Sequence, residues 1–147
     1  MAASAWVVHD KFKEYLGDGT VDMDADAFKM ILCLSTSNIA TTSIDGYATV
    51  TNEVATNFGY TQGGESITSP TWVESSGTVT FDCDNVVWTA SGGSITARYA
   101  AIYDDAVTTP VADPIVCDSL LDAGDVTATT GNTFTVAINA SGVFTVS

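Results

Sequence analysis

The chain has 147 residues, a length typical of one domain with a hydrophobic core of its own. It carries 18 acidic residues against 4 Lys and Arg, so its formal net charge is −14 at pH 7. Phosphate contacts dominate nucleic-acid affinity, so this charge argues against DNA and RNA as partners, and it disfavours anionic membrane surfaces for the same reason. No apolar run approaches the roughly 20 residues of a membrane-spanning helix. We therefore expect a protein made in the cytoplasm that binds neither nucleic acid nor membrane.

The first segment combines aromatic and aliphatic residues with two of the four cations, Lys11 and Lys13. Phe12 and Leu16 are spaced to share one face of a helix, which predicts one or two helical turns ending at Gly17. The segment could equally be an extended arm that packs on a neighbouring molecule. We therefore divide the chain into an N-terminal arm or short helix, residues 1–16, and a β-sandwich domain, residues 17–147.

The next segments predict a buried strand and a long loop. Residues 28–34, FKMILCL, form a nearly continuous apolar run, typical of a strand that is buried on both faces or lies at the centre of a sheet. Residues 39–64 have no regular pattern apart from a short strand-like run at 47–51. We expect a long loop that lies over the sandwich, and ordered loops of this length are usually functional or interfacial.

Residues 78–103 predict two long strands joined by a turn. Apolar and polar residues alternate strictly over 78–84, which is the period of a strand with one buried face. The run Val86-Val87-Trp88 breaks that alternation and predicts a bulge or a bend onto a second sheet. Ser-Gly-Gly-Ser at 91–94 is a turn signal, and alternation resumes from 95 to 101. The pattern predicts a long β-hairpin.

Three further strands are expected, at residues 115–121, 133–139 and 143–146. About eight short strands without a linker favour an all-β fold: one antiparallel β-sandwich or jelly-roll-like domain. Alternation predicts five residues in the core between the sheets: Val79, Phe81, Tyr99, Phe134 and Val136.

No residue pattern demands catalysis or a cofactor. Asp22, Asp24 and Asp26 imitate the opening of a calcium loop, but Ala27 stands where the loop needs Gly. His9 is the sole histidine, and no G-x-S-x-G nucleophile motif is present. We expect no enzymatic activity, no metal and no cofactor. The three cysteines are widely spaced and odd in number, which predicts buried free thiols.

Four stretches carry a resemblance to a known family: FKEYLGDGTVDMDADAFKMILCLSTSN, GYTQGG, TVTFDCDNVVWTASGGSITARYAAIYDD and the ending GNTFTVAINASGVFTVS. The chain resembles small virion structural proteins of tailed bacteriophages, most of all capsid cement or decoration proteins. The resemblance implies a protein on the outside of the virion capsid that binds the major capsid protein and stabilises the shell. A small sandwich also leaves sheet edges, and homo-oligomers commonly cover such edges by symmetry, so we expect a dimer or a trimer.

Isolated hydrophobic residues in the terminal segment and the long loop are the expected contacts with the capsid or a sister subunit. They are Trp6, Val7, Val8, Phe12, Tyr47, Phe58 and Tyr60. On this view residues 1–12 could be deleted without unfolding the sandwich. The alternative function is a phage tail or fibre module that binds host glycans, which would require exposed aromatic residues on one face. A hydrolase would require a convergent polar pocket.

Overall fold

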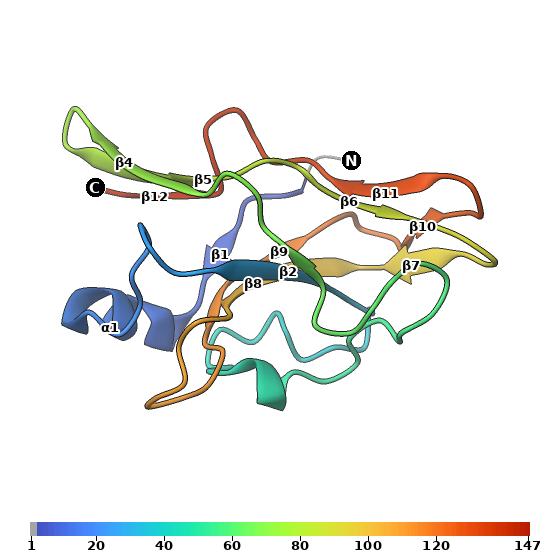
Figure 1. Cartoon of the computed structure of the whole chain (residues 1–147), viewed down its shortest axis with the longest axis horizontal. Coiled ribbons are helices and arrows are strands. Elements are labelled where there is room, and N and C mark those ends of the chain that lie inside the picture. The colour runs from blue at the N-terminus through green and yellow to red at the C-terminus, as the bar shows by residue number, and fades with distance from the viewer. Residues whose placement is uncertain (1–2) are drawn as a thin grey trace.

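The computed structural model describes residues 3–147, which form mostly strands arranged in several antiparallel sheets. Figure 1 shows two layers of strands, one above the other, with helix α1 (Asp10–Asp18) at one end. The predicted all-β, sandwich-like single domain is thereby confirmed.

The lower layer is built on a five-stranded antiparallel sheet with its longest strands at the centre. In spatial order its strands are β1 (Val7–Val8), β9 (Ile115–Leu120), β8 (Tyr99–Asp104), β2 (Phe28–Cys33) and β3 (Glu65–Ser66). Strand β7 (Ile95–Ala97) leads almost directly into β8 and pairs with β10 (Val126–Ala128). This second pair prolongs the lower layer at the end far from the helix (Figure 1).

The upper layer consists of a three-stranded sheet and a two-stranded one. The first contains, in spatial order, β12 (Phe144–Val146), β5 (Thr78–Asp82) and β4 (Thr71–Ser75). The second pairs β6 (Val86–Thr89) with β11 (Thr133–Val136). The break predicted after Asn85 therefore separates β5 from β6, which belong to different sheets.

The predicted long hairpin is wrong. The turn at residues 91–94 exists, but β6 pairs with β11 and β7 pairs with β10, so the turn carries the chain from the upper layer to the lower one. The pairing is decided by residues far along the chain: Phe134 lies opposite Trp88, and Ala128 lies opposite Ile95. A tight turn between two alternating strands can join neighbours in one sheet, as in a hairpin, or connect strands in two different layers.

The main core lies between the layers. Phe81, Phe134 and Val136 are buried in it as predicted. Val79 is half-buried, and Tyr99 packs against a second, smaller cluster, so these two core predictions are wrong.

Strand β2 is covered on both faces, as its apolar run predicted. Met30 and Leu32 face the main core, while Ile31 and Cys33 belong to the second cluster. The predicted loop supplies the other side of this cluster with Ile39 and the partly buried Ile44, Tyr47 and Val50. The strand expected at 47–51 is instead a short 3₁₀ turn, η1 (Tyr47–Thr49).

The N-terminal segment is part of the sandwich and not an arm. β1 pairs with β9, and helix α1 (Asp10–Asp18) follows at once. The helix ends one residue later than predicted, with Gly19 as its left-handed C-cap at φ 81°. His9 and Phe12 are buried, at 0% and 1% exposure, so deleting residues 1–12 would remove β1 and side chains of the interior. That a sandwich without these residues still folds stays a prediction.

Candidate functional site

A groove runs along β12, between the N-terminal segment and the end of the chain. One part, about 600 Å³, lies between residues 3–8 and 139–145. The other part, about 440 Å³, lies between helix α1 and residues 144–147. Val8, Phe144 and Thr145 line both parts, so the two form one channel, which we call the β12 groove.

Apolar side chains form much of the wall of the β12 groove. Trp6, Val8 and Leu16 are half-buried, and Val146 at its mouth is 43% exposed. Phe144 lines both parts, and its ring packs edge-on against Phe12, with ring centroids 5.8 Å apart. Phe12 and Phe144 belong to the main core, and Trp6, Val8 and Leu16 pack against it, so most of the groove wall is preformed.

Two strand edges border the β12 groove. β1 ends the five-stranded sheet and β12 ends the three-stranded sheet, so each has one edge without a neighbouring strand among residues 3–147. Such an edge presents unpaired backbone N–H and C=O groups and can accept an additional strand. Lys13, the one charged residue of the lining, is within 3.5 Å of Asp10 on its own helix.

The predicted contact residues lie in different parts of the structure. Trp6 and Val8 line the β12 groove, and Val7 beside them is 47% exposed. Phe12 and Tyr60 are each 1% exposed and belong to the main core, and Phe12 also lines the second part of the β12 groove. Their role as contact residues stays a prediction.

Phe58 lies apart from the groove. Its ring is 40% exposed and covers Gly93, where an added Cβ would come within 2.3 Å of the ring. Its backbone is left-handed at φ 53°, an uncommon conformation for a bulky residue. The ring of Phe58 can lie in this position only because residue 93 is a glycine.

Tyr47 and Tyr60 meet at Glu53, a residue that the sequence patterns did not single out. Both hydroxyls donate to its carboxylate at 2.6 Å, Tyr47 to Oε2 and Tyr60 to Oε1. The backbone N–H of Gly63 donates to Oε1 at 2.8 Å. Burial, followed by the hydrogen bond to Glu53, raises the pKa of both tyrosines, so both hydroxyls stay protonated donors.

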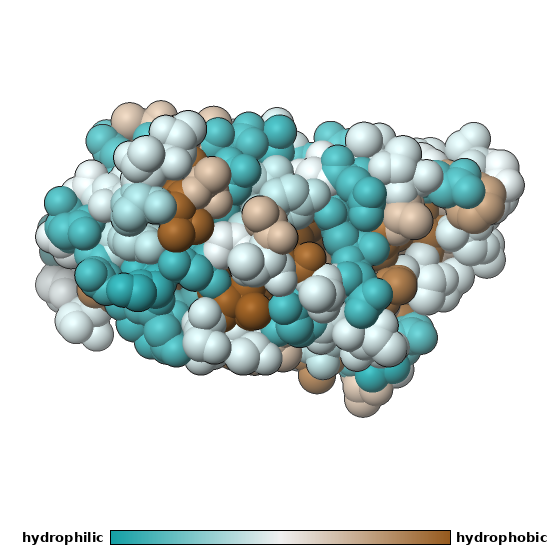
Figure 2. Space-filling view, turned by 90° about the horizontal axis from the view of Figure 1, so that it is seen from below, coloured by the Kyte–Doolittle hydropathy of each residue, from teal (hydrophilic) through white to brown (hydrophobic). Residues whose placement is uncertain are grey.

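A polar cavity of about 430 Å³ opens beside this carboxylate. Its lining consists of Tyr47, Ala48, Val50, Asn52, Glu53 and Gln62. The cavity belongs to the long loop that covers the lower sheet. Seen from that side, apolar residues form only separate small areas among polar ones (Figure 2).

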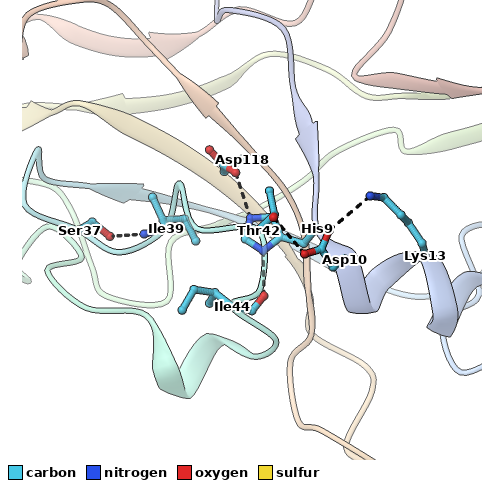
Figure 3. A network of polar contacts seen from close by, with 8 residues as sticks. All are labelled: His9, Asp10, Lys13, Ser37, Ile39, Thr42, Ile44 and Asp118. Atoms are coloured by element: carbon cyan, nitrogen blue, oxygen red, sulfur yellow. Dashed lines mark hydrogen bonds and ion pairs between the residues drawn. The ribbon is translucent and has the colours of Figure 1, made fainter.

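His9 has a structural position (Figure 3). Its Nε2 is 3.0 Å from Asp118 Oδ1, and its Nδ1 is 2.8 Å from the carbonyl oxygen of Ile44. Both ring nitrogens are thus engaged, and neither faces a serine hydroxyl. Next to it, the hydroxyl of Thr42 donates to Asp10. His9 and Asp10 thus both bind the long loop and hold the start of α1 against it.

The aspartates that imitate the opening of a calcium loop bind backbone groups of their own segment. Oδ1 of Asp22 accepts the N–H of Asp24, and Oδ2 of Asp26 accepts the N–H of Asp22. Among residues 3–147, no group of three or more acidic, histidine or cysteine side chains is arranged to hold a metal ion.

The predicted burial of the free thiols is confirmed. Burial raises the pKa of Cys33 and Cys83 to about 12.

Comparison with family models, with curated proteins and with solved structures found no match to the chain. In the part of the chain that the structure describes, no helix is long and apolar enough to cross a membrane.

Proposed function

We propose that the protein is a capsid decoration protein of a tailed bacteriophage. It binds the outer surface of the shell formed by the major capsid protein and stabilises it, as a dimer or a trimer. The resemblance of the sequence to virion proteins suggests the class. The observation that carries the proposal is the β12 groove, since a preformed apolar channel between two free strand edges suits a protein partner.

The charge of the chain fits this role. A net charge of −14 keeps the free protein soluble before assembly and repels the packaged genome. It also favours a shell surface that carries lysine and arginine around the contact, because complementary charge speeds association.

The test uses purified shells that lack the protein. Added wild-type protein is located on them by electron cryomicroscopy, and its binding is measured by co-sedimentation. Regular density on the outer shell supports the proposal. Density on the tail, or no binding, refutes it.

Two matched variants connect binding to the β12 groove. Val146 at its mouth and Val87 on β6 are 43% and 48% exposed, so either can become glutamate without burying a charge. Val146→Glu should abolish binding to shells, while Val87→Glu should bind like the wild type. Equal binding of the two variants would exclude the groove as the contact.

A further inference from the structure

Glu53 is a half-buried carboxylate, and no Lys, Arg or His side chain among residues 3–147 forms an ion pair with it. Its three hydrogen-bond donors, the hydroxyls of Tyr47 and Tyr60 and the N–H of Gly63, are all uncharged. The four Lys and Arg side chains of the protein are each within salt-bridge distance of another carboxylate. These pairs are Lys11–Glu14, Lys13–Asp10, Lys29–Asp105 and Arg98–Asp125.

The carboxylate retains capacity for one more donor. An ionised carboxylate offers about four acceptor positions. Oε1 of Glu53 accepts two hydrogen bonds, from Tyr60 and Gly63, whereas Oε2 accepts one, from Tyr47. A ligand in the cavity beside Glu53 and Tyr47 can therefore donate to Oε2.

The walls of the cavity are rigid. The ring of Tyr47 stacks on Tyr103, with centroids 4.9 Å apart and planes 13° from parallel. The hydroxyl of Tyr103 donates to the carbonyl oxygen of Gly63 at 2.9 Å, which anchors the turn whose N–H also binds Glu53. At the rim, Asn52 is held by its side-chain amide, which donates to the carbonyl of Thr36 at 3.0 Å.

The chemistry of this wall selects a cation. A carboxylate without a counter-ion attracts positive charge, and an aromatic ring attracts a cation to its face. The net charge of −14 strengthens both effects and disfavours anionic ligands. The volume of about 430 Å³ suits the end of an extended side chain or a small organic molecule.

We propose that this cavity is a binding site for an organic cation, an alkylguanidinium or alkylammonium group that donates to Glu53 Oε2 and lies against the ring of Tyr47. Such a group is carried by the arginine or lysine of another protein and by free small amines. The site lies on the long loop and does not depend on the proposed capsid role.

The experiment is a titration of the ¹⁵N-labelled full chain at constant ionic strength. The probes are N-acetyl-arginine amide, agmatine and putrescine, and N-acetyl-citrulline amide is the neutral isostere of the first. We expect saturable shifts at Gly63 and at the side-chain amides of Asn52 and Gln62. The neutral isostere should bind at least about tenfold more weakly, because a charge-assisted hydrogen bond is lost.

The probes distinguish the sources of the cation. Tighter binding of N-acetyl-arginine amide than of agmatine and putrescine assigns the cavity to a protein side chain, and the reverse order assigns it to a free amine. Equal binding of the citrulline isostere, or shifts spread over many acidic residues without saturation, overturns the proposal.

Variants locate the binding. Glu53→Gln should weaken it at least about tenfold. Glu74→Gln removes the same charge at an exposed position on β4 and should leave it unchanged. Because Glu53→Gln could perturb the loop, Gln62→Lys provides a second test: residue 62 is exposed at the rim, and its new ammonium group should occupy the site and abolish binding. Undiminished binding by Gln62→Lys would refute the assignment.

Discussion

Replacing Phe81 with alanine tests the centre of the upper layer. The side chain is fully buried on β5, and its ring lies 5.4 Å from that of Phe28 and 5.5 Å from that of Phe144. Burial of a phenylalanine contributes about 1.5–3 kcal/mol, and each aromatic pair adds about 0.5–1.5 kcal/mol. These contributions, together with the cavity that is left, predict a loss of about 4 kcal/mol, within the range of roughly 3–5 kcal/mol usual for Phe→Ala in cores.

The assay is equilibrium unfolding in urea, followed by tryptophan fluorescence and by circular dichroism. The midpoint should fall at an unchanged slope, because the surface exposed on unfolding is nearly the same. Val73→Ala is the control, since that side chain is 59% exposed and should change the free energy by less than about 0.5 kcal/mol. A loss below about 1 kcal/mol for Phe81→Ala would refute the packing of β5 against the lower layer.

Two further substitutions test the N-terminal anchor and the long loop. His9→Ala should cost about 3–5 kcal/mol in urea unfolding, because it leaves the buried Asp118 without its partner; a smaller loss in His9→Ala/Asp118→Ala than in the single variant would show that the stranded charge is the cause. Gly64→Ala places a Cβ within 1.9 Å of the carbonyl oxygen of Met30, whereas Gly77→Ala has the same left-handed backbone and open space. Both variants should lose the roughly 1–2 kcal/mol of stability that an alanine at positive φ costs. The clash with β2 should lower the melting temperature of Gly64→Ala well below that of Gly77→Ala. Equal melting temperatures would contradict the close approach of the loop to β2.

The sequence predicted what alternation and apolar runs encode locally. The strict period of two at residues 78–82 and 133–136 marks β5 and β11, and the apolar run at 28–33 marks a strand with two covered faces. The N-terminal residues Trp6 and Val8, selected because they are too apolar for a free tail, line the β12 groove.

Pairing and burial depend on distant residues and were not predictable in the same way. The partner of β6 is β11, some 50 residues away, and local alternation does not contain that choice. Phe12 and Tyr60 have the same local appearance as exposed hydrophobic residues but are enclosed by several elements. Glu53 and its tyrosines lie in a segment without periodicity, so only the folded loop brings them together.

A buried acid at the end of β8 should make the stability of the protein depend on pH. Asp104 is 0% exposed; its Oδ1 accepts the N–H groups of Ala106 and Val107, while its Oδ2 has no donor. Burial, together with the neighbouring Asp26, raises the pKa of Asp104 to about 7. A protonated Asp104 can donate to Asp26, which gives the orphan oxygen a partner.

The sign of the effect follows from the raised pKa. The unfolded chain releases this proton near pH 4, whereas the folded protein keeps it to about pH 7. The contribution of this proton to the free energy of unfolding is therefore complete below pH 4. It declines as the pH rises from about 4 to 7 and is lost above, with an upper limit of about 4 kcal/mol.

Asp104→Asn imitates the protonated acid, so it should match the stability of the wild type at pH 4.5 and exceed it at pH 8. Asp122→Asn, an exposed acid, controls for the change in net charge. If urea unfolding shows the same dependence on pH for both variants, Asp104 does not hold the proton, and the pH response comes from general charge repulsion.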